Sequence, residues 1–204
     1  MDNPMTLNSS PEQTVWSNTP ANELWVMDKL ILARTMGYNC GPVGMEVPEP
    51  NWYIVRPCVN AMGLGLGAEK VWLERDTKHL PLGYFWCEFF EGNHYSVDYQ
   101  FGMPILTVEG YKTGDTFTKW GSWIKVDKKI GLPSKLHMLS HKRILNVEYI
   151  GDKVIEVHYR NNPDFEFNNK EFLPVWEGES TNPPEGYTYI EHPDIHGRIG
   201  GFIR

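Results

Sequence analysis

The stretch of sequence that decides the fold runs from Ile144 to Arg160 and reads ILNVEYIGDKVIEVHYR. Apolar and polar residues alternate on both sides of Gly151–Asp152, which is the period of a β-strand with one buried face. The stretch therefore predicts an antiparallel hairpin, whose strands Ile144–Ile150 and Val154–Tyr159 are joined by a turn at Gly151–Asp152.

The register of this hairpin follows from the rule that side chains directly opposite each other lie on the same face of a sheet. Apolar residues meet apolar ones only if the pairs are Leu145 with Tyr159, Val147 with Val157 and Tyr149 with Ile155. The same register pairs Asn146 with His158 and Glu148 with Glu156 on the other face. A two-residue turn would mix the two faces, so we expect a three-residue loop or a β-bulge.

Glu148 and Glu156 are the informative pair, because directly opposite carboxylates lie about 5 Å apart between Cβ atoms and repel each other. Three arrangements relieve the repulsion: water solvates the face, one carboxyl group keeps its proton, or a cation lies between the two. An ordinary exposed polar face is the alternative without function. Because the change removes a repulsion, Glu156→Gln is expected to leave the free protein as stable as before, or slightly more stable.

A glycine-rich segment, Asn60–Gly67, reads NAMGLGLG and follows an apolar strand that contains Arg56. Its glycines allow the backbone to approach a ligand closely and to point N–H groups at it. No Gly-Lys-Ser/Thr follows, which excludes a Walker A loop, and Lys70–Leu73 reads as a strand, which excludes the dinucleotide fingerprint. A glycine turn between antiparallel strands has the geometry of a flap over nucleotide phosphates; a hairpin tip without a ligand is the alternative.

The rest of the chain reads as α+β, dominated by antiparallel sheet. Helical spacing of apolar residues predicts a helix over Asn22–Met36, stopped by Gly37, and a short helix over Leu132–Lys142. Further strands are expected between turn residues, at Trp52–Cys58, Glu69–Leu73, Tyr84–Phe90, Tyr95–Phe101, Ile105–Glu109 and Phe117–Val126. The segment from Asn161 to Arg204 is polar and contains several prolines, so we expect mostly loops there.

The composition limits the classes of partner. The chain has 204 residues and a formal net charge of -7, so it has no general attraction for nucleic acids or for anionic membrane surfaces. Three cysteines, far apart and without a CxxC pair, argue against a disulfide framework or a structural zinc site and favour a reducing compartment. The sequence contains neither a signal peptide nor an apolar run long enough to cross a membrane, and we expect a cytoplasmic protein.

Four blocks of this sequence resemble, in the same order, those of ATP-grasp enzymes, over about residues 28 to 165. Asp28-Lys29 followed by a helix resembles the start of the family's nucleotide-binding domain. Tyr53–Pro57 (YIVRP) with the glycine segment resembles its phosphate strand and flap, and Phe85–Asp98 (FWCEFFEGNHYSVD) resembles its hinge. The 144–160 hairpin resembles the strands on which an acidic residue and a Glu-x-Asn motif hold magnesium.

The resemblance implies an ATP-grasp-like α+β fold of two small lobes, residues 21–83 and 84–175, with a nucleotide cleft between them. A polar N-terminal arm, residues 1–20, and a loop-rich C-terminal segment, residues 176–204, flank this domain. The implied function is an ATP-dependent ligase that uses ATP and Mg²⁺ to activate a small carboxylate or peptide as an acyl phosphate, which an amine or thiol then attacks. The alternative is a non-catalytic ATP-grasp-like binding or assembly module, for example of viral origin.

The resemblance also implies nucleotide contacts. Arg56 would contact the phosphates, where the family usually has lysine, under a flap that contains Gly63, Gly65 and Gly67. Cys87 and Glu88 would border the adenine at the hinge, chiefly through their backbone, and Phe90 would pack on the base. His94 stands where many members have a glutamate that binds the ribose.

The same resemblance implies the metal ligands and the catalytic residues. Glu148 and Glu156 would ligate magnesium, with His158 in place of the usual asparagine and with Asn146 or Asn162 as a substitute ligand. Arg160 would hold the acyl phosphate or the substrate carboxylate, so Arg56 and Arg160 are the expected catalytic residues. Because imidazole suits magnesium poorly and the family's separate N-terminal substrate domain is missing, nucleotide binding is better supported than turnover.

Overall fold

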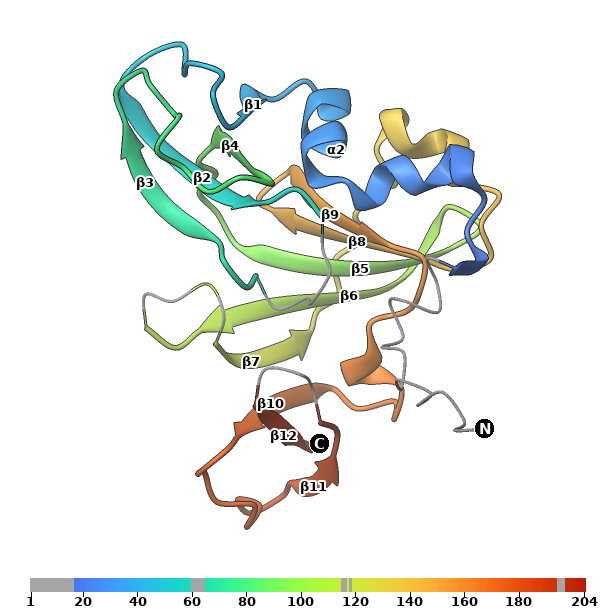
Figure 1. Cartoon of the computed structure of the whole chain (residues 1–204). Coiled ribbons are helices and arrows are strands. Elements are labelled where there is room, and N and C mark those ends of the chain that lie inside the picture. The colour runs from blue at the N-terminus through green and yellow to red at the C-terminus, as the bar shows by residue number, and fades with distance from the viewer. Residues whose placement is uncertain (1–16, 60–64, 115–116, 118, 194–196) are drawn as a thin grey trace, which may run out of the picture.

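The computed structural model describes residues 17–59, 65–114, 117, 119–193 and 197–204. Most of the predicted N-terminal arm therefore lies outside the described residues. The chain forms two antiparallel sheets with a few short helices, which confirms the expected α+β class (Figure 1). Within the described ranges, no helix combines the length and the apolar character that crossing a membrane requires.

The small sheet has four strands and the large sheet has eight. The small sheet runs in the order β1 (Cys40–Pro42), β4 (Tyr84–Glu88), β2 (Asn51–Pro57) and β3 (Glu69–Leu73). The large sheet runs in the order β11 (Thr188–Glu191), β12 (Arg198–Ile203), β10 (Glu171–Trp176), β7 (Trp120–Lys125), β6 (Met103–Lys112), β5 (His94–Gln100), β8 (Leu145–Ile150) and β9 (Lys153–His158). The two sheets thus divide between β4 and β5, after Glu88.

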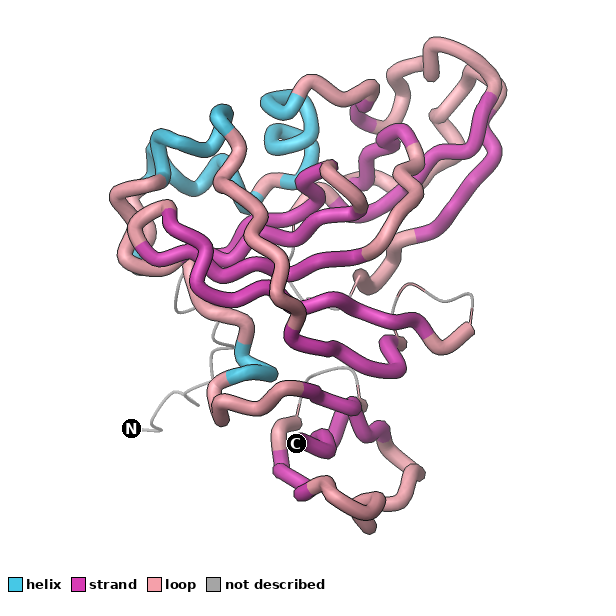
Figure 2. The backbone as a smooth tube through the Cα atoms, turned by 180° about the vertical axis from the view of Figure 1, so that it is seen from behind, coloured by secondary structure: helices cyan, strands magenta, loops and turns pink. Residues whose placement is uncertain are grey.

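Short helices cover one face of the large sheet at β5, β8 and β9. They are η1 (Ala21–Met27), α2 (Lys29–Met36) and η2 (Ser134–Leu139), and a further turn, η3 (Pro163–Phe165), precedes β10. The main core lies between these helices and the strands; its largest fully buried members include Leu32, Leu136, Tyr99 and Tyr149. Figure 2 shows η1, α2 and η2 at one end of the molecule, and η3 beside β10–β12 at the other.

The single helix predicted over Asn22–Met36 is wrong in one respect, because it is divided at Asp28. Residues Ala21–Met27 form a 3₁₀ helix, and the α-helix begins only at Lys29. The Asp28 side chain accepts a hydrogen bond from the Ile31 backbone N–H at 3.0 Å. Asp28 is therefore the N-cap of α2 and ends the preceding 3₁₀ helix. Gly37 ends α2 in the left-handed conformation (φ 85°), as expected.

The hairpin register is confirmed where the site depends on it. Asn146 pairs with His158, Val147 with Val157 and Glu148 with Glu156. A bulge after Glu148 then shifts the register, so Tyr149 pairs with Val154 and the expected pair with Ile155 is wrong. Val154 takes the buried place, and Ile155 faces the other side of the sheet.

Sequence analysis did not predict three strands in the loop-rich segment after Asn161, where β10, β11 and β12 extend the large sheet. Proline and glycine are unfavourable inside strands, so a sequence pattern that contains them does not predict a strand. Here Pro174 lies within β10 and pairs with Gly201 of β12. A Cβ on Gly201 would lie 2.4 Å from the Phe172 ring, so glycine is required for this packing.

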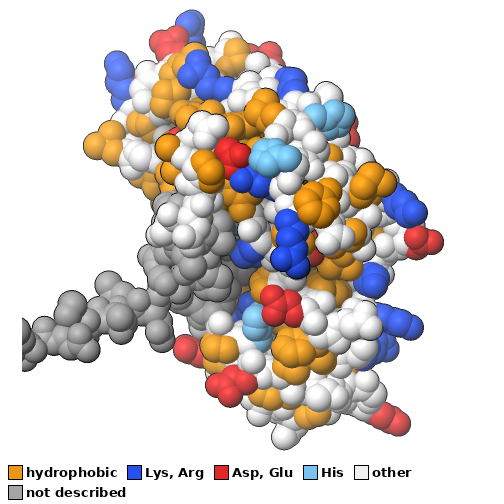
Figure 3. Space-filling model, turned by 90° about the vertical axis from the view of Figure 1, so that its right-hand side faces the viewer, with side chains coloured by type: hydrophobic (Ala, Val, Ile, Leu, Met, Phe, Trp, Pro, Cys, Tyr) orange, Lys and Arg blue, Asp and Glu red, His pale blue; other side chains and the backbone are white. Residues whose placement is uncertain are grey.

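On the face shown in Figure 3, acidic and basic side chains are interspersed and neither sign forms a large patch.

Candidate functional site

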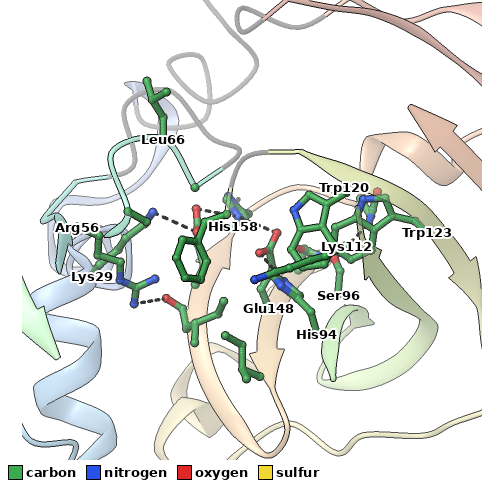
Figure 4. Close-up of a pocket in the computed structure, with 18 of the residues that line it drawn as sticks. Lys29, Arg56, Leu66, His94, Ser96, Lys112, Trp120, Trp123, Glu148 and His158 are labelled. Carbon is green, nitrogen blue, oxygen red and sulfur yellow. Dashed lines mark hydrogen bonds and ion pairs between the residues drawn. The ribbon is translucent and has the colours of Figure 1, made fainter. Parts of the chain in front are cut away.

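A cavity of about 190 Å³ lies between the two sheets (Figure 4). The first turn of α2 and strand β2 form one wall, and the polar face of β5, β8 and β9 forms the floor. The ends of β6 and β7 and the η3 region complete it. The cavity therefore collects side chains from segments that are far apart in the sequence.

The floor is built by alternation along three neighbouring strands. Odd-numbered residues of β5 and β8, such as Val97 and Val147, are buried against the helices, so the even-numbered residues face the cavity. Cross-strand pairing then produces two polar rows, Ser96–Glu148–Glu156 and Asp98–Asn146–His158. The Asn146 amide donates to Ser96 Oγ and to Asp98 Oδ1, both at 2.8 Å, which fixes the second row.

Basic side chains of the chain itself stand beside both facing carboxylates. Glu156 lies 3.1 Å from Lys29 Nζ and 3.3 Å from His158 Nε2. Glu148 lies 3.1 Å from His94 Nε2 and 3.8 Å from His158 Nε2. Lys29 thus stands beside Glu156 and His94 beside Glu148, while the imidazole of His158 lies within 3.8 Å of both carboxylates.

The pKa values of these groups reflect burial and pairing together. Burial lowers the pKa of Lys29, and the charge of Glu156 opposes that shift. Burial by itself would raise the pKa of Glu148, but the hydrogen bond with His94 and the positive charges nearby outweigh it and lower the pKa to about 2. Glu148 is therefore ionised at neutral pH.

Arg56 connects the small sheet to the cavity floor. Its guanidinium donates to the Ile155 carbonyl oxygen at 3.0 Å and lies 5.3 Å from the centre of the Phe85 ring. Burial lowers the pKa of this group, and the charge of Glu156 opposes that shift. Its buried Nε has no hydrogen-bond partner among the residues that the structure describes, so one donor remains for a ligand.

Five aromatic side chains line the cavity: Phe89, Phe90, Phe117, Trp120 and Trp123. Of these, Trp120 and Trp123 form the wall opposite Lys29 and Arg56 (Figure 4). The His94 ring packs edge-on against Trp120 and Trp123, with centroid distances of 4.6 and 5.2 Å. Lys112 Nζ lies 4.2 Å from the centre of the Phe117 ring. This wall offers flat apolar surface beside basic groups, which suits a ligand with an aromatic ring and negative charge.

The C-terminal segment supplies the last wall. Arg198 in β12 is buried and pairs with Asp164 of η3, with NH1 at 3.0 and 3.1 Å from the two carboxylate oxygens. Asp164 also lies 3.3 Å from His192 Nε2. Both Asp164 and Arg198 line the cavity, so the strands that sequence analysis missed belong to the site.

Most residues expected in the site line this cavity: Arg56, Gly65, Phe90, His94, Asn146, Glu148, Glu156, His158, Arg160 and Asn162. Three others do not. Gly67 packs near Pro57 and the Tyr84 hydroxyl, Cys87 is buried opposite Cys40, and Glu88 turns away to accept a hydrogen bond from the Asn39 N–H at 3.1 Å. Gly63 lies outside the described residues.

Sequence reasoning missed several residues that line the cavity: Lys29, Ser96, Lys112, Trp120, Trp123, Asp164 and Arg198. One signal was available, because His94-Tyr-Ser-Val-Asp98 has the same alternation as the hairpin and so predicts a polar face. Lys29 and Arg198 carry no such local signal. Their positions depend on how the helix and the C-terminal strands pack against the sheet.

The expected magnesium ligands do not fit a resident magnesium ion. Among the described residues, no three His, Cys, Asp or Glu side chains are arranged to hold a metal. Glu148, Glu156 and His158 contact one another or other basic groups, and Asn146 is engaged with Ser96 and Asp98. Magnesium also prefers oxygen ligands in octahedral geometry, which this set with an imidazole does not offer.

Comparisons with known proteins identify the fold. No family model matches the sequence, and no curated protein sequence matches it. A solved structure from Archaeoglobus fulgidus, of a protein proposed to belong to the ATP-grasp superfamily, is 12% identical with a TM-score of 0.51, and the match covers 88% of this chain and 64% of that one.

Two further solved structures are less similar. The ATP-grasp ligase PsnB with a minimal precursor is 14% identical with a TM-score of 0.41, covering 70% of this chain and 54% of that one. An L-amino acid ligase from Bacillus licheniformis is 17% identical with a TM-score of 0.41, covering 68% and 41%. This chain spans less than two thirds of the length of each of the three structures. On the strength of the first match and the antiparallel sheets described above, the chain has an ATP-grasp-like fold.

Proposed function

We propose that this protein is an ATP-dependent ligase of the ATP-grasp type, which binds ATP as its magnesium complex in the cavity between the sheets. One observation carries the proposal. Five Lys and Arg side chains line the cavity against three carboxylates, although the chain as a whole has a net charge of -7: Lys29, Arg56, Lys112, Arg160 and Arg198 against Glu148, Glu156 and Asp164. A local excess of positive charge beside an aromatic wall suits a nucleotide with its phosphates.

In this proposal, the chain's residues act by positioning and by charge. The γ-phosphoryl group passes from ATP to a substrate carboxylate oxygen, which releases ADP. An amine or thiol then attacks the acyl carbon and displaces phosphate. Arg56 and Arg160 neutralise the negative charge on the transferring group, and Phe90 packs on the base.

The experiment measures nucleotide binding by thermal stability, and then turnover by released phosphate. ATP with magnesium at one hundred times its dissociation constant should stabilise the protein by about 2.7 kcal/mol. Arg160→Ala should weaken this effect, whereas Arg75→Ala is the control, because Arg75 is exposed and pairs with Glu46 away from the cavity. A melting temperature that does not change with millimolar ATP, ADP or GTP would contradict the proposal.

A second candidate is a non-catalytic nucleotide-binding module. The pairing of Glu156 with Lys29 favours it, because a carboxylate held by an ammonium is not free to ligate the metal of a reacting nucleotide. The two candidates differ in turnover. A panel of amino acids and peptides should stimulate release of ADP and phosphate from a ligase, and binding without any stimulated release would indicate the module.

A further inference from the structure

All four carboxylate oxygens of Glu148 and Glu156 have a basic nitrogen of this chain nearby. The distances lie between 3.1 and 3.8 Å: Lys29 and His158 stand beside Glu156, and His94 and His158 stand beside Glu148. The imidazole of His158 is shared between the two glutamates. A divalent ion would need the same oxygens, so it would have to displace these nitrogens.

Lys29 is fixed in this position by its backbone. It is the first residue of α2, and its N–H donates to the Cys58 carbonyl oxygen at 2.6 Å. The preceding residue, Asp28, forms a bridge with Val59. The Lys29 side chain is only 7% exposed, so its ammonium has no solvent-facing alternative without a shift of the helix. Lys29 is thus part of the folded framework and not a surface side chain that happens to reach the cavity.

The charges match this arrangement. With the imidazoles left aside, the two carboxylates and the ammonium that touches Glu156 carry one net negative charge, and the positive charges of Arg56 and Arg160 act on this group from a greater distance. Without the ammonium the pair would carry two negative charges, which is the complement of a divalent cation. We propose that Lys29 is a built-in cation that takes the place of a divalent metal ion at the Glu148–Glu156 hairpin, and that its removal turns the hairpin into a divalent-cation site. This inference concerns the nucleotide-free protein and does not depend on the proposed ligase activity.

The experiment titrates MnCl₂ into the full-length protein without nucleotide and follows free Mn²⁺ by electron paramagnetic resonance. Manganese is the probe because carboxylate ligands suit it and because the free ion is paramagnetic. Lys29→Met should bind Mn²⁺ about tenfold more tightly than wild type, or better, since one nearby positive charge is gone. Lys112→Met is the matched control: it removes a lysine from the same cavity that stands over Phe117, and should bind Mn²⁺ as weakly as wild type. Lys29→Arg keeps the charge and should also resemble wild type.

Two results would overturn the proposal. One is a Lys29→Met protein that is folded but binds Mn²⁺ no more tightly than wild type. The other is Mn²⁺ binding by wild type that Glu148→Gln abolishes, because the hairpin would then hold a divalent ion despite Lys29. The second comparison decides the matter even if Lys29→Met does not fold: wild-type binding that is unaffected by Glu148→Gln would support the inference.

Discussion

Replacement of Glu156 by glutamine tests whether the hairpin carboxylates are held apart by repulsion or held in place by cations. Two facing glutamates, taken alone, lead to the expectation that the change is neutral or stabilising. The structure leads to the opposite expectation, that the variant is less stable than wild type. Glu156 lies 3.1 Å from the Lys29 ammonium, and the two side chains are 11% and 7% exposed, so Glu156→Gln leaves a buried positive charge without its partner.

The magnitude follows from the burial of this pair. Removal of one partner of a buried ion pair costs about 3–5 kcal/mol. The glutamine oxygen still accepts a hydrogen bond from Lys29, which favours the lower end, about 3 kcal/mol. The loss of stability cannot exceed about 5 kcal/mol, because Lys29 can instead give up its proton, and deprotonation of a lysine at pH 7 costs about that much. For a chain of this length, about 3 kcal/mol corresponds to a fall in melting temperature of about 6–12 °C.

The assay is thermal and urea unfolding of wild type, Glu156→Gln and Glu148→Gln at neutral pH. Glu148→Gln is the control, with a smaller expected loss, because Glu148 faces imidazoles and its side chain is 26% exposed. The stability difference between wild type and Glu156→Gln should decrease as the pH rises toward 10.5, the ordinary pKa of lysine. Burial lowers the pKa of Lys29 in the folded state, so in this pH range the unfolded chain binds more protons than the folded one, and stability rises with pH. A Glu156→Gln protein as stable as wild type would refute the role given to Lys29.

Three further predictions concern other parts of the structure. The pKa of Glu148 is lowered from 4.5 to about 2, so its ionised form stabilises the fold above pH 4.5 and this stabilisation is lost as the pH falls toward 2. In acid unfolding, the free energies of unfolding of Glu148→Gln and wild type should therefore converge between pH 4.5 and pH 2. Tyr99→Phe and Tyr149→Phe should each cost about 1–3 kcal/mol in urea unfolding, since the two buried hydroxyls bond each other at 2.7 Å, and the double variant should cost less than the sum of the single ones. Gly201→Ala should reduce the free energy of unfolding by about 1–3 kcal/mol, because the new Cβ overlaps the Phe172 ring. Gly131→Ala is the control, since a Cβ there meets nothing within 4 Å, and it should melt like wild type. Equal melting temperatures of the two variants would contradict the packing of β10 on β12.

The sequence by itself determined the hairpin and its pairing near the site. Alternation with a period of two is a local property, and it allows only one register that keeps apolar residues together, so Glu148 opposite Glu156 could be predicted. The same local reasoning located β2, β3 and β5 within a few residues. It also placed Arg56, His94 and Arg160 in one site through the ATP-grasp resemblance, and all three line the cavity.

Only the tertiary structure decided what surrounds the two carboxylates. The bulge that moves Ile155 to the cavity face depends on how β9 packs under α2, and the strands β10–β12 depend on pairing with β7 despite Pro174. Lys29 is far from Glu156 along the chain, and no periodicity connects a helix N-terminus to a particular strand position. Their contact exists because burial of the helix against the sheet removes water from both groups, and a charge that loses water must gain a partner.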